Sequence, residues 1–393
     1  MNKHKRGALR RSLAGTDTPA GFGARVRDLA LRELSPLVLR IDREGLYPAD
    51  VMRSLGRLGG FRQHLSSRRG DKPLGLGAAI EAIAAVGETC LSTAFLVWCQ
   101  DACGWYLENS PNVLLRERDL PAIADGSRFG GTALSNPMKH YAGIEPLRLT
   151  GTPVNGGYLV NGSLPWVSNL GEHHAVGAIF HVEGKAPRDV MALLDCAAPG
   201  LDLVQSVHFT ALEGTRTFAM RLRDVFVSEA QVLADPVEGF IPRIRAGFVL
   251  LQLGMALGLV QGCIDNIERS GRSRREINRY LPDQVPDLTE ALDALRTETL
   301  QLARTPWEAD PSYMHRVWRA RLTGAELSLR AAQGAMLHAG ASGYTVDAPA
   351  QRRLREAYFI AIVTPSVKHL HKVLTTATAF SDVHHAKEAL RMT

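Results

Sequence analysis

The spacing of apolar residues divides the chain into three zones. From about Phe22 to Ser127 they recur every three to four positions, the helical period, and a long run rich in Ala and Leu at 78–106 is typical of a helix packed on most sides. In the segment PADVMRSLGRLG, Pro48 stands where a helix N-terminus tolerates proline. We expect this zone to be all α-helical, and its first amphipathic helix to use Val26, Leu29, Leu31 and Leu34.

The middle zone, from about 129 to 232, has a different pattern. Short runs rich in β-forming residues alternate with turn signals such as Asn161-Gly162. So many short strands indicate a small sandwich or barrel. Four runs are expected to be strands: 158–160, 178–182, 190–194 and 217–222.

The helical period returns after Pro242 and persists to the end of the chain. About four long helices are expected, with short loops near 282–286 and 306–311, which predicts a bundle. The almost wholly apolar segment Ala246–Ile264 has the length of a membrane span. Its glycines and two glutamines favour a buried helix of that bundle instead. Two further helix faces are marked by Leu288, Leu292, Leu295 and Leu302, and by Val317, Ala320, Leu322 and Leu327.

The order of these zones predicts an α+β multidomain protein. We expect a basic flexible tail at 1–20, an N-terminal α-helical domain at 21–127, a middle β-barrel or sandwich domain at 128–235, and a C-terminal four-helix bundle at 236–393. At 393 residues, with 45% of them hydrophobic, the chain can bury a large core.

The charge distribution and the cysteines indicate which partners, cell compartment and metal or disulfide sites to expect. The net charge is +6, but five Lys and Arg residues precede the first acid, Asp17, so the rest of the chain is nearly neutral. A basic start of this kind without an apolar stretch is no secretory signal. We therefore expect a cytoplasmic protein with no nucleic-acid or membrane partner. The five cysteines are odd in number and widely spread, which favours buried thiols over disulfides or a zinc or other metal site.

Two segments of the middle zone resemble the acyl-CoA dehydrogenase family. TALSNP at 132–137 is similar to the family's loop ending in Thr-Glu-Pro, which lies against the flavin ring, so the resemblance assigns Thr132, Leu134 and Ser135 to cofactor binding. The family's Gly-Ser pair for the phosphates is not matched. GGYLVNGSLPWVSN at 156–169 resembles a strand pair ending in Trp-Ile-Thr. Residues two apart on a strand share a face, so Trp166 and Ser168 are expected to pack on and hydrogen-bond the flavin ring.

Further segments extend the resemblance over most of the chain after about residue 120. TRTFAMRLRDVFV at 215–227 resembles the strand that closes the family's middle domain. LHAGASGY at 337–344 and QRRLREA at 351–357 are similar to the family's Leu-His-Gly-Gly-x-Gly-Tyr and Arg-Asp-Ala segments. The glycines permit a tight turn, which in the family approaches the cofactor of a neighbouring subunit. The resemblance therefore assigns His338, in a structural role, with Gly340, Gly343 and Ser366 to cofactor binding.

The family's catalytic glutamate is missing from both of its known positions. The usual position, nine residues after the Arg of Arg-Asp-Ala, is Thr364, whose hydroxyl does not ionise near neutral pH and so cannot serve as the base. The alternative position, on the long helix that opens the bundle, is Phe248. Glu356 stands at the family's Asp position and is expected to be a helix-surface or structural ion-pair residue.

Three functions therefore remain open. The first is an oxidoreductase that acts on an acyl thioester or related small organic substrate with FAD as hydride acceptor. The second is a two-component monooxygenase that uses reduced FMN or FAD and oxygen, whose relatives often carry a proline after the base position, as in Thr364-Pro365. The third is a non-catalytic protein that binds an acyl ligand or a partner.

The resemblance also implies partners. A homo-oligomer, dimer or tetramer, is expected, together with a flavin reductase or an electron-transfer partner. A cluster of arginines at 269–279 is either a solvated helix end or a phosphate-binding group.

Overall fold

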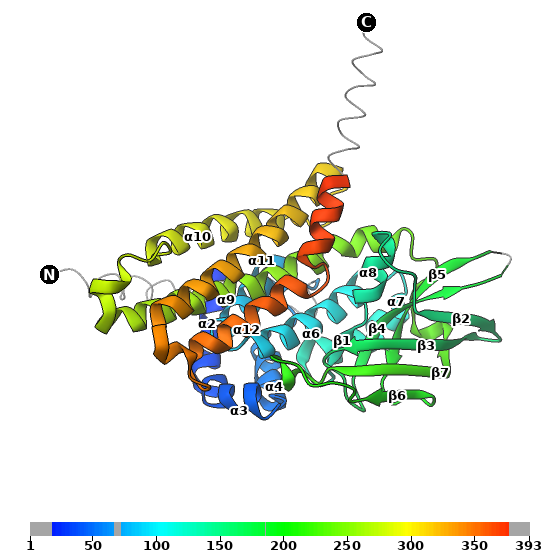
Figure 1. Cartoon of the computed structure of the whole chain (residues 1–393). Coiled ribbons are helices and arrows are strands. Elements are labelled where there is room, and N and C mark those ends of the chain that lie inside the picture. Colours follow the sequence, from blue (N-terminus) through cyan, green and yellow to red (C-terminus); the bar gives the residue numbers. More distant parts are fainter. Residues whose placement is uncertain (1–17, 67–71, 185, 377–393) are drawn as a thin grey trace, which may run out of the picture.

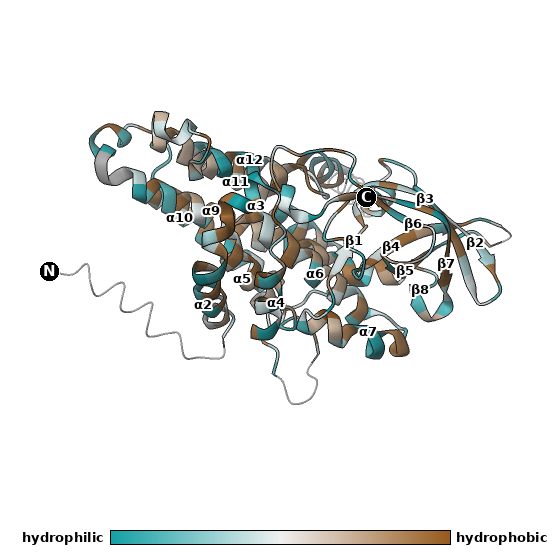
Figure 2. Cartoon of the chain, turned by 90° about the horizontal axis from the view of Figure 1, so that it is seen from below, coloured by the Kyte–Doolittle hydropathy of each residue, from teal (hydrophilic) through white to brown (hydrophobic). Residues whose placement is uncertain are grey.

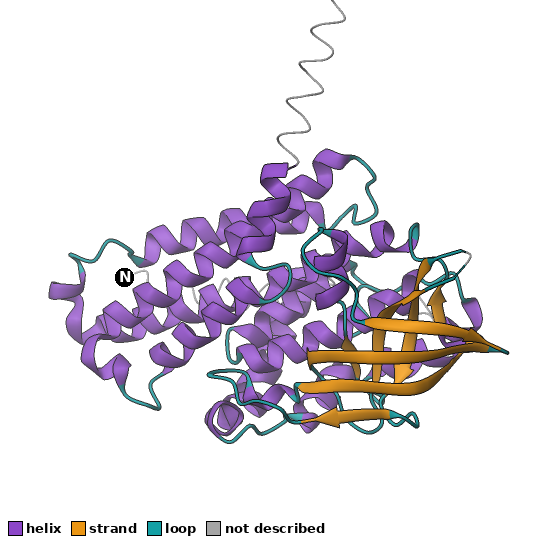
Figure 3. Cartoon of the chain, turned by 45° about the vertical axis from the view of Figure 1, so that its right-hand side comes forward, coloured by secondary structure: helices purple, strands orange, loops and turns teal. Residues whose placement is uncertain are grey.

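The structure is a computed structural model that describes residues 18–66, 72–184 and 186–376, without the side chains of 271–273. Residues 1–17 of the predicted basic tail lie outside the described residues. Two layers of helices lie side by side, and the β-sheet covers one end of them (Figures 1 and 3). The expected order of helices, strands and helices is confirmed.

The N-terminal part is entirely helical, as predicted. Val26, Leu29 and Leu34 are buried, but Leu31 is exposed, because it follows Leu29 by two residues and so lies on the opposite side of the helix. The helices are α2 (Pro19–Leu29), α3 (Val38–Arg43), α4 (Ala49–Leu58), α5 (Leu76–Gly87), α6 (Leu91–Asn109) and α7 (Val113–Asp125).

The single helix expected at 78–106 is two helices, α5 and α6, which break at residues 88–90. The Arg353 guanidinium donates to the carbonyl oxygen of Gly87 at 2.9 Å and also to that of Glu88. A side chain from the far end of the sequence therefore caps the last turn of α5. No local pattern in the sequence signals such a break.

The middle part is one mixed sheet of eight strands in the order β6-β7-β3-β2-β4-β5-β8, with β1 paired to β4. The four predicted strands correspond to β3, β4, β5 and β7. β1, β6 and β8 were missed because they are short, as is the small helix α8 (Ser135–Tyr141), whereas β2 was missed because Gly151 and Pro153 interrupt its strand pattern. The strands are β1 (Gly130–Thr132), β2 (Leu149–Val154), β3 (Gly157–Val167), β4 (Ala175–Val182), β5 (Arg188–Asp195), β6 (Leu201–Val204), β7 (Phe218–Ser228) and β8 (Val232–Ala234).

This sheet folds over on itself. Its strands lie in two crossing groups (Figure 3) that enclose a core of their own, in which the rings of Tyr158 on β3 and Phe180 on β4 meet over β2 with centroids 5.3 Å apart. A Cβ atom on Gly151 of β2 would overlap the Phe180 ring, so only glycine fits at that position. The predicted small sandwich or barrel is therefore realised as a folded mixed sheet.

The C-terminal part is the predicted bundle. Its helices are α9 (Phe240–Asn278), α10 (Val285–Leu302), α11 (Pro311–Ala339) and α12 (Pro349–Ile362), followed by helical residues 367–376. In α9, 94% of the most apolar window within Phe240–Ser270 is buried, so its apolar surface packs against other helices. Apolar residues gather between the helices and hydrophilic ones face outward (Figure 2).

All five cysteines are free and buried, so the prediction of core thiols is confirmed. Burial raises the pKa of Cys103 and that of Cys263 to about 12. These side chains are therefore neutral at physiological pH and pack as small hydrophobic groups.

Candidate functional site

Two hydroxyl groups that are 229 residues apart in the sequence meet at the junction of the sheet and the bundle. Ser135, the first residue of α8, and Thr364, just after α12, are joined by a 2.8 Å hydrogen bond between their side-chain oxygens. Ser135 is exposed, whereas only 7% of Thr364 is. The residue at the expected base position thus lies beside the loop that resembles the family's flavin-binding loop.

A buried relay holds Thr364 in place. Gln252 of α9 donates from Nε2 to the Thr364 carbonyl oxygen at 2.8 Å, and its Oε1 accepts from Arg321 Nε of α11 at 2.9 Å. Arg321 Nη2 also donates to the Ile360 carbonyl oxygen at 2.7 Å, near the end of α12. Three helices therefore fix the position of the Thr364 backbone.

Arg321 is an unusual component of this relay because only 1% of it is exposed and no described carboxylate pairs with it. Burial lowers the pKa of Arg321 to about 10, so it stays protonated at neutral pH. Neither Gln252 nor Arg321 was predicted as a site residue. The sequence signal that could have found Gln252 is its position as a polar residue within an otherwise apolar helix.

The second expected base position, Phe248, is filled by an aromatic cluster. The Phe248 ring packs edge-on against Trp98 at 5.1 Å and stacks with Tyr106 at 6.2 Å. Trp98 Nε1 donates to the Phe248 carbonyl oxygen at 3.3 Å, and Phe95 stacks on Trp98. Neither position therefore offers a carboxylate.

Glu356 is a structural ion-pair residue, one of the two roles expected for it. Its carboxylate lies 2.8 Å from Arg352 and 3.0 Å from Arg353, and accepts a bond from the Leu91 backbone nitrogen at 3.3 Å. Only 2% of Glu356 is exposed. Because two guanidinium groups and a backbone nitrogen engage its carboxylate, Glu356 joins α12 to the start of α6 and is not available as a base.

The residues expected to contact a flavin ring lie at or just beyond the ends of the strands β1 and β3. Trp166 is 59% exposed, Val167 is buried and Ser168 is half-buried, so Trp166 and Ser168 share a face as predicted. Ser168 forms a β-bridge with Thr132, which places these two close together. Thr132 Oγ1 bonds the Tyr106 hydroxyl at 2.7 Å. The side chain of Leu134 is buried, which leaves only its backbone for contact with a ligand.

The glycine-rich turn after α11 is not brought to this site within one chain, because α12 separates it from Thr364. His338 is buried and its Nε2 contacts the Asp283 carbonyl oxygen at 2.7 Å, which is a structural role. Gly340 has a φ of 56°, in the left-handed region that glycine adopts readily. Arg274, from the predicted arginine cluster, donates to Ser342 Oγ at 3.0 Å and thereby supports the turn.

Ser366 lies two residues beyond Thr364 and is half-buried. Its Oγ accepts a long bond from the His369 backbone nitrogen at 3.4 Å, at the start of the helical residues 367–376. Ser366 therefore lies close to Thr364, whereas the glycine-rich turn, which the resemblance also assigned to cofactor binding, does not.

Comparison with known proteins identifies the family. Residues 16–127 match the acyl-CoA dehydrogenase N-terminal domain, and residues 246–364 match the acyl-CoA dehydrogenase C-terminal domain, together more than half of the chain. The chain belongs to the acyl-CoA dehydrogenase family. Members of this family are flavin oxidoreductases.

Individual acyl-CoA dehydrogenase relatives match along nearly the whole chain. The probable acyl-CoA dehydrogenase YngJ of Bacillus subtilis (strain 168) is 24% identical, over 86% of this chain and 91% of its own length. The butyryl-CoA dehydrogenase structure from Megasphaera elsdenii superposes with a TM-score of 0.83 at 18% identity, covering 93% and 98% of the two chains. KijD3, in complex with FMN and dTDP-3-amino-2,3,6-trideoxy-4-keto-3-methyl-D-glucose, gives a TM-score of 0.73 at 19% identity, covering 91% and 94%.

The residues of this acyl-CoA dehydrogenase family member fit the ring of a flavin. Trp166 presents a largely exposed aromatic side chain, and the hydroxyl groups of Ser135, Ser168 and Thr132 can bond the polar edge of a planar heterocycle. On the side where the family has its Gly-Ser pair, Lys139 is instead paired with Glu145 at 3.5 Å. These side chains therefore fit the ring of a flavin, but they do not reproduce the family's contacts with its phosphates.

Proposed function

We propose that this protein is a flavin-dependent oxidoreductase that uses reduced flavin and oxygen to oxidise a small organic substrate. The observation that carries the proposal is the Ser135–Thr364 hydroxyl pair at the position of the family's base, with Phe248 in the alternative position. Removal of a proton next to a thioester carbonyl needs a group whose pKa lies near the working pH. A threonine hydroxyl, a phenyl ring and an ion-paired Glu356 do not provide one.

The proposed reaction balances without a carboxylate at this position. One oxygen atom of O₂ enters a bond of the substrate to hydrogen, and the other leaves as water. Reduced flavin, when bound, would supply the two electrons and two hydrogens, and a separate reductase acting on NADH would restore it. A bound flavin, FMN or FAD, would supply this redox chemistry. The chain itself orients the ring through Trp166 and Ser168, and excludes water through the aromatic cluster around Phe248.

The hydroxyl groups of Ser135 and Thr364 have a specific role in this proposal. Each can donate and accept a hydrogen bond, so the pair can hold a proton at the Thr364 oxygen and deliver a bond to negative charge that develops nearby. The Gln252–Arg321 relay keeps Thr364 in position while this happens, because it bonds the Thr364 carbonyl oxygen and leaves the hydroxyl to its bond with Ser135.

Thr364→Val is expected to slow the reaction of the bound, reduced flavin with oxygen by about tenfold, which corresponds to loss of one hydrogen bond of about 1.4 kcal/mol in the transition state. Stopped-flow absorbance of the anaerobically reduced protein mixed with oxygenated buffer measures this rate. Thr364→Ser is the matched control, since it keeps the hydroxyl and should react within about twofold of the wild type. Equal rates for Thr364→Val and Thr364→Ser would rule out this role of the hydroxyl.

The second candidate is dehydrogenation of an acyl thioester with FAD, which is favoured by the similarity to curated acyl-CoA dehydrogenases over most of the chain. Anaerobic mixing of the FAD-loaded protein with short-chain acyl-CoAs separates the two functions. We expect no bleaching of the flavin band, and oxygen uptake only when NADH and a flavin reductase are present. Rapid bleaching by an acyl-CoA would instead establish the dehydrogenase. A colourless protein that takes up no flavin would favour the non-catalytic function.

We also propose that the protein assembles into a homo-oligomer through the bundle. Tyr358 and Ile362, four residues apart on one face of α12, are 59% and 67% exposed. Side chains of this size are expected to be covered by a partner. The double variant Tyr358→Glu with Ile362→Glu should therefore shift the mass measured by analytical ultracentrifugation toward the monomer. The double variant Glu268→Gln with Glu276→Gln, also on the bundle, should leave the mass unchanged. A monomeric wild type would refute the proposal.

A further inference from the structure

Three side-chain hydroxyl groups are linked in a row that begins at Ser168, one of the residues proposed to hold the flavin ring. Ser168 Oγ lies 2.6 Å from Thr217 Oγ1, which lies 2.8 Å from Thr215 Oγ1. Thr215 Oγ1 in turn bonds the carbonyl oxygen of Leu212 at 2.6 Å. Ser168 and Thr217 are half-buried and Thr215 is buried, so this hydroxyl chain runs from the proposed flavin contact into the protein.

The inner end of the hydroxyl chain fixes the direction of every hydrogen bond in it. A hydroxyl group has one hydrogen to donate, and a carbonyl oxygen has none. Thr215 must therefore donate to the Leu212 carbonyl oxygen. Its own oxygen can then only accept from Thr217, and for the same reason Thr217 accepts from Ser168. The hydrogen of Ser168 is thereby used, and its oxygen offers only lone pairs to a ligand.

The backbone that carries the hydroxyl chain is held in an uncommon conformation. Leu212 and Arg216, on either side of Thr215, have φ values of 67° and 45°, in the left-handed region that such residues rarely adopt. Residues keep this conformation where the surrounding structure imposes it. Asn169, next to Ser168, donates from its backbone nitrogen to the Thr215 carbonyl oxygen at 3.0 Å. The fold therefore holds the two ends of the hydroxyl chain against each other.

A group that only accepts hydrogen bonds distinguishes the two redox states of a flavin. Reduction by two electrons and two protons adds N–H hydrogens to ring nitrogens that are acceptors in the oxidised ring. We propose that the hydroxyl chain makes Ser168 an acceptor that favours reduced over oxidised flavin, with Thr217 as the positioning residue that sets the direction of its bond. This inference rests on the proposed contact between Ser168 and the flavin ring, and it adds a preference for the redox state that the proposed reaction uses.

The test is the affinity of the full-length protein for FAD and for FMN, measured by calorimetry with each flavin oxidised and, under anaerobic conditions, reduced with dithionite. We expect the reduced form to bind about tenfold more tightly than the oxidised form, the equivalent of one hydrogen bond of about 1.4 kcal/mol. The midpoint potential of the bound flavin gives the same ratio independently. It should lie about 30 mV above that of the free flavin for each factor of ten.

Thr217→Val separates this role from a purely structural one. Without the Thr217 hydroxyl, Ser168 is free to donate its hydrogen to the oxidised ring. Oxidised flavin should then bind about tenfold more tightly, while the affinity for the reduced form changes by less than about twofold. Loss of packing would instead weaken the binding of both forms. Thr217→Ser keeps the hydroxyl and should restore the wild-type ratio of the two affinities.

Ser168→Ala tests the other end of the same bond. It removes the acceptor itself, so it should weaken the binding of reduced flavin by about tenfold and leave the binding of oxidised flavin almost unchanged. The ratio of the two affinities falls in both variants, but through opposite redox states. A change in the folding of either variant, which circular dichroism would detect, does not produce this opposite pattern.

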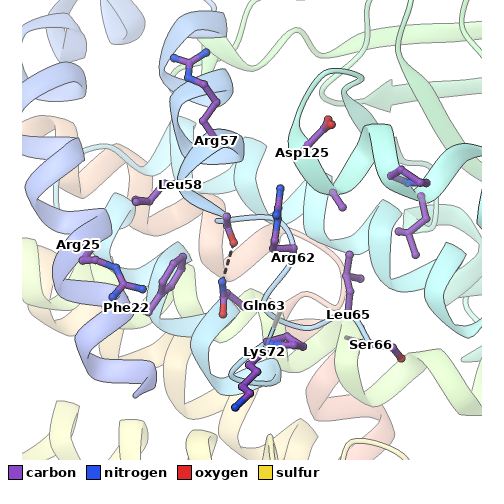
Figure 4. A pocket seen from close by; sticks show the side chains of 15 residues that line it. Phe22, Arg25, Arg57, Leu58, Arg62, Gln63, Leu65, Ser66, Lys72 and Asp125 are labelled. Atoms are coloured by element: carbon purple, nitrogen blue, oxygen red, sulfur yellow. Dashed lines mark hydrogen bonds between the residues drawn. The ribbon is translucent and has the colours of Figure 1, made fainter. Parts of the chain in front are cut away.

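Two further variants are controls for the location of the effect. Thr152 is exposed on β2 and pairs with Leu159 in the first half of β3, so Thr152→Val makes the same substitution away from the hydroxyl chain. A pocket of about 360 Å³ in the N-terminal helical part, lined by Arg57 among others, contains none of the three hydroxyl groups (Figure 4). Thr152→Val and Arg57→Gln should leave both affinities unchanged.

Several results would overturn the inference: a wild type that binds oxidised flavin as tightly as reduced flavin, a ratio unchanged in Thr217→Val, equal weakening of both forms, or the same change in a control variant. These results differ from failure of the proposed reaction, which bleaching by an acyl-CoA would reveal without altering the ratio of affinities. A protein that binds neither FAD nor FMN in either redox state would refute both.

Discussion

Glu356→Ala is expected to lower the free energy of unfolding by about 3–5 kcal/mol, the usual cost of removing one partner from a buried ion pair. The loss leaves the guanidinium groups of Arg352 and Arg353 buried without their carboxylate, and the Leu91 backbone nitrogen without its acceptor. Urea unfolding followed by circular dichroism measures the change.

An exposed ion pair provides the control for this prediction. Glu298 pairs with Arg316 at 2.9 Å on the bundle surface, where both side chains are more than a third exposed. Glu298→Ala should cost no more than about 1 kcal/mol, because solvent screens such pairs. If Glu356→Ala lowered the free energy of unfolding no more than Glu298→Ala, the Glu356 carboxylate would not stabilise the contact between α12 and α6. Its availability as a catalytic base would then have to be reconsidered.

Gly258→Ala is expected to destabilise the protein by about 2 kcal/mol or more, although alanine favours helices over glycine by about 1 kcal/mol. Gly258 lies inside α9 where α5 crosses it. A Cβ atom there would overlap the Ala84 carbonyl oxygen, a backbone atom that cannot move aside without shifting α5. The steric cost of separating two packed helices therefore outweighs the gain in helix propensity. Thermal unfolding of the variant measures the net effect.

Gly334→Ala is the matched substitution, since Gly334 is also a glycine inside a long helix, α11. The nearest atom to a Cβ there would be Asp283 Cβ at 3.5 Å, which is ordinary van der Waals contact. Only the propensity term then remains, and Gly334→Ala should be neutral or stabilising by up to about 1 kcal/mol. Similar effects for both variants would show that the close crossing of α5 and α9 does not govern the cost.

Local pattern was sufficient for much of the architecture. The helical period of the first and last zones and the turn-rich middle zone predicted the α, β, α order, because a period of 3.6 or 2 states which face of an element is buried. The same information was too weak for β1, β6 and β8, which are three or four residues long and show no alternation. The resemblance placed Ser135, Trp166, Ser168 and Thr364, and identified the missing glutamate.

The sequence by itself therefore determined the family, the order of the elements and the absence of a carboxylate at Thr364 and Phe248. Only the tertiary structure decided what each buried face packs against, since periodicity carries no information about the partner. The Ser135–Thr364 bond, the relay from Arg321 through Gln252, and the cap that Arg353 places on α5 all join residues far apart in the chain.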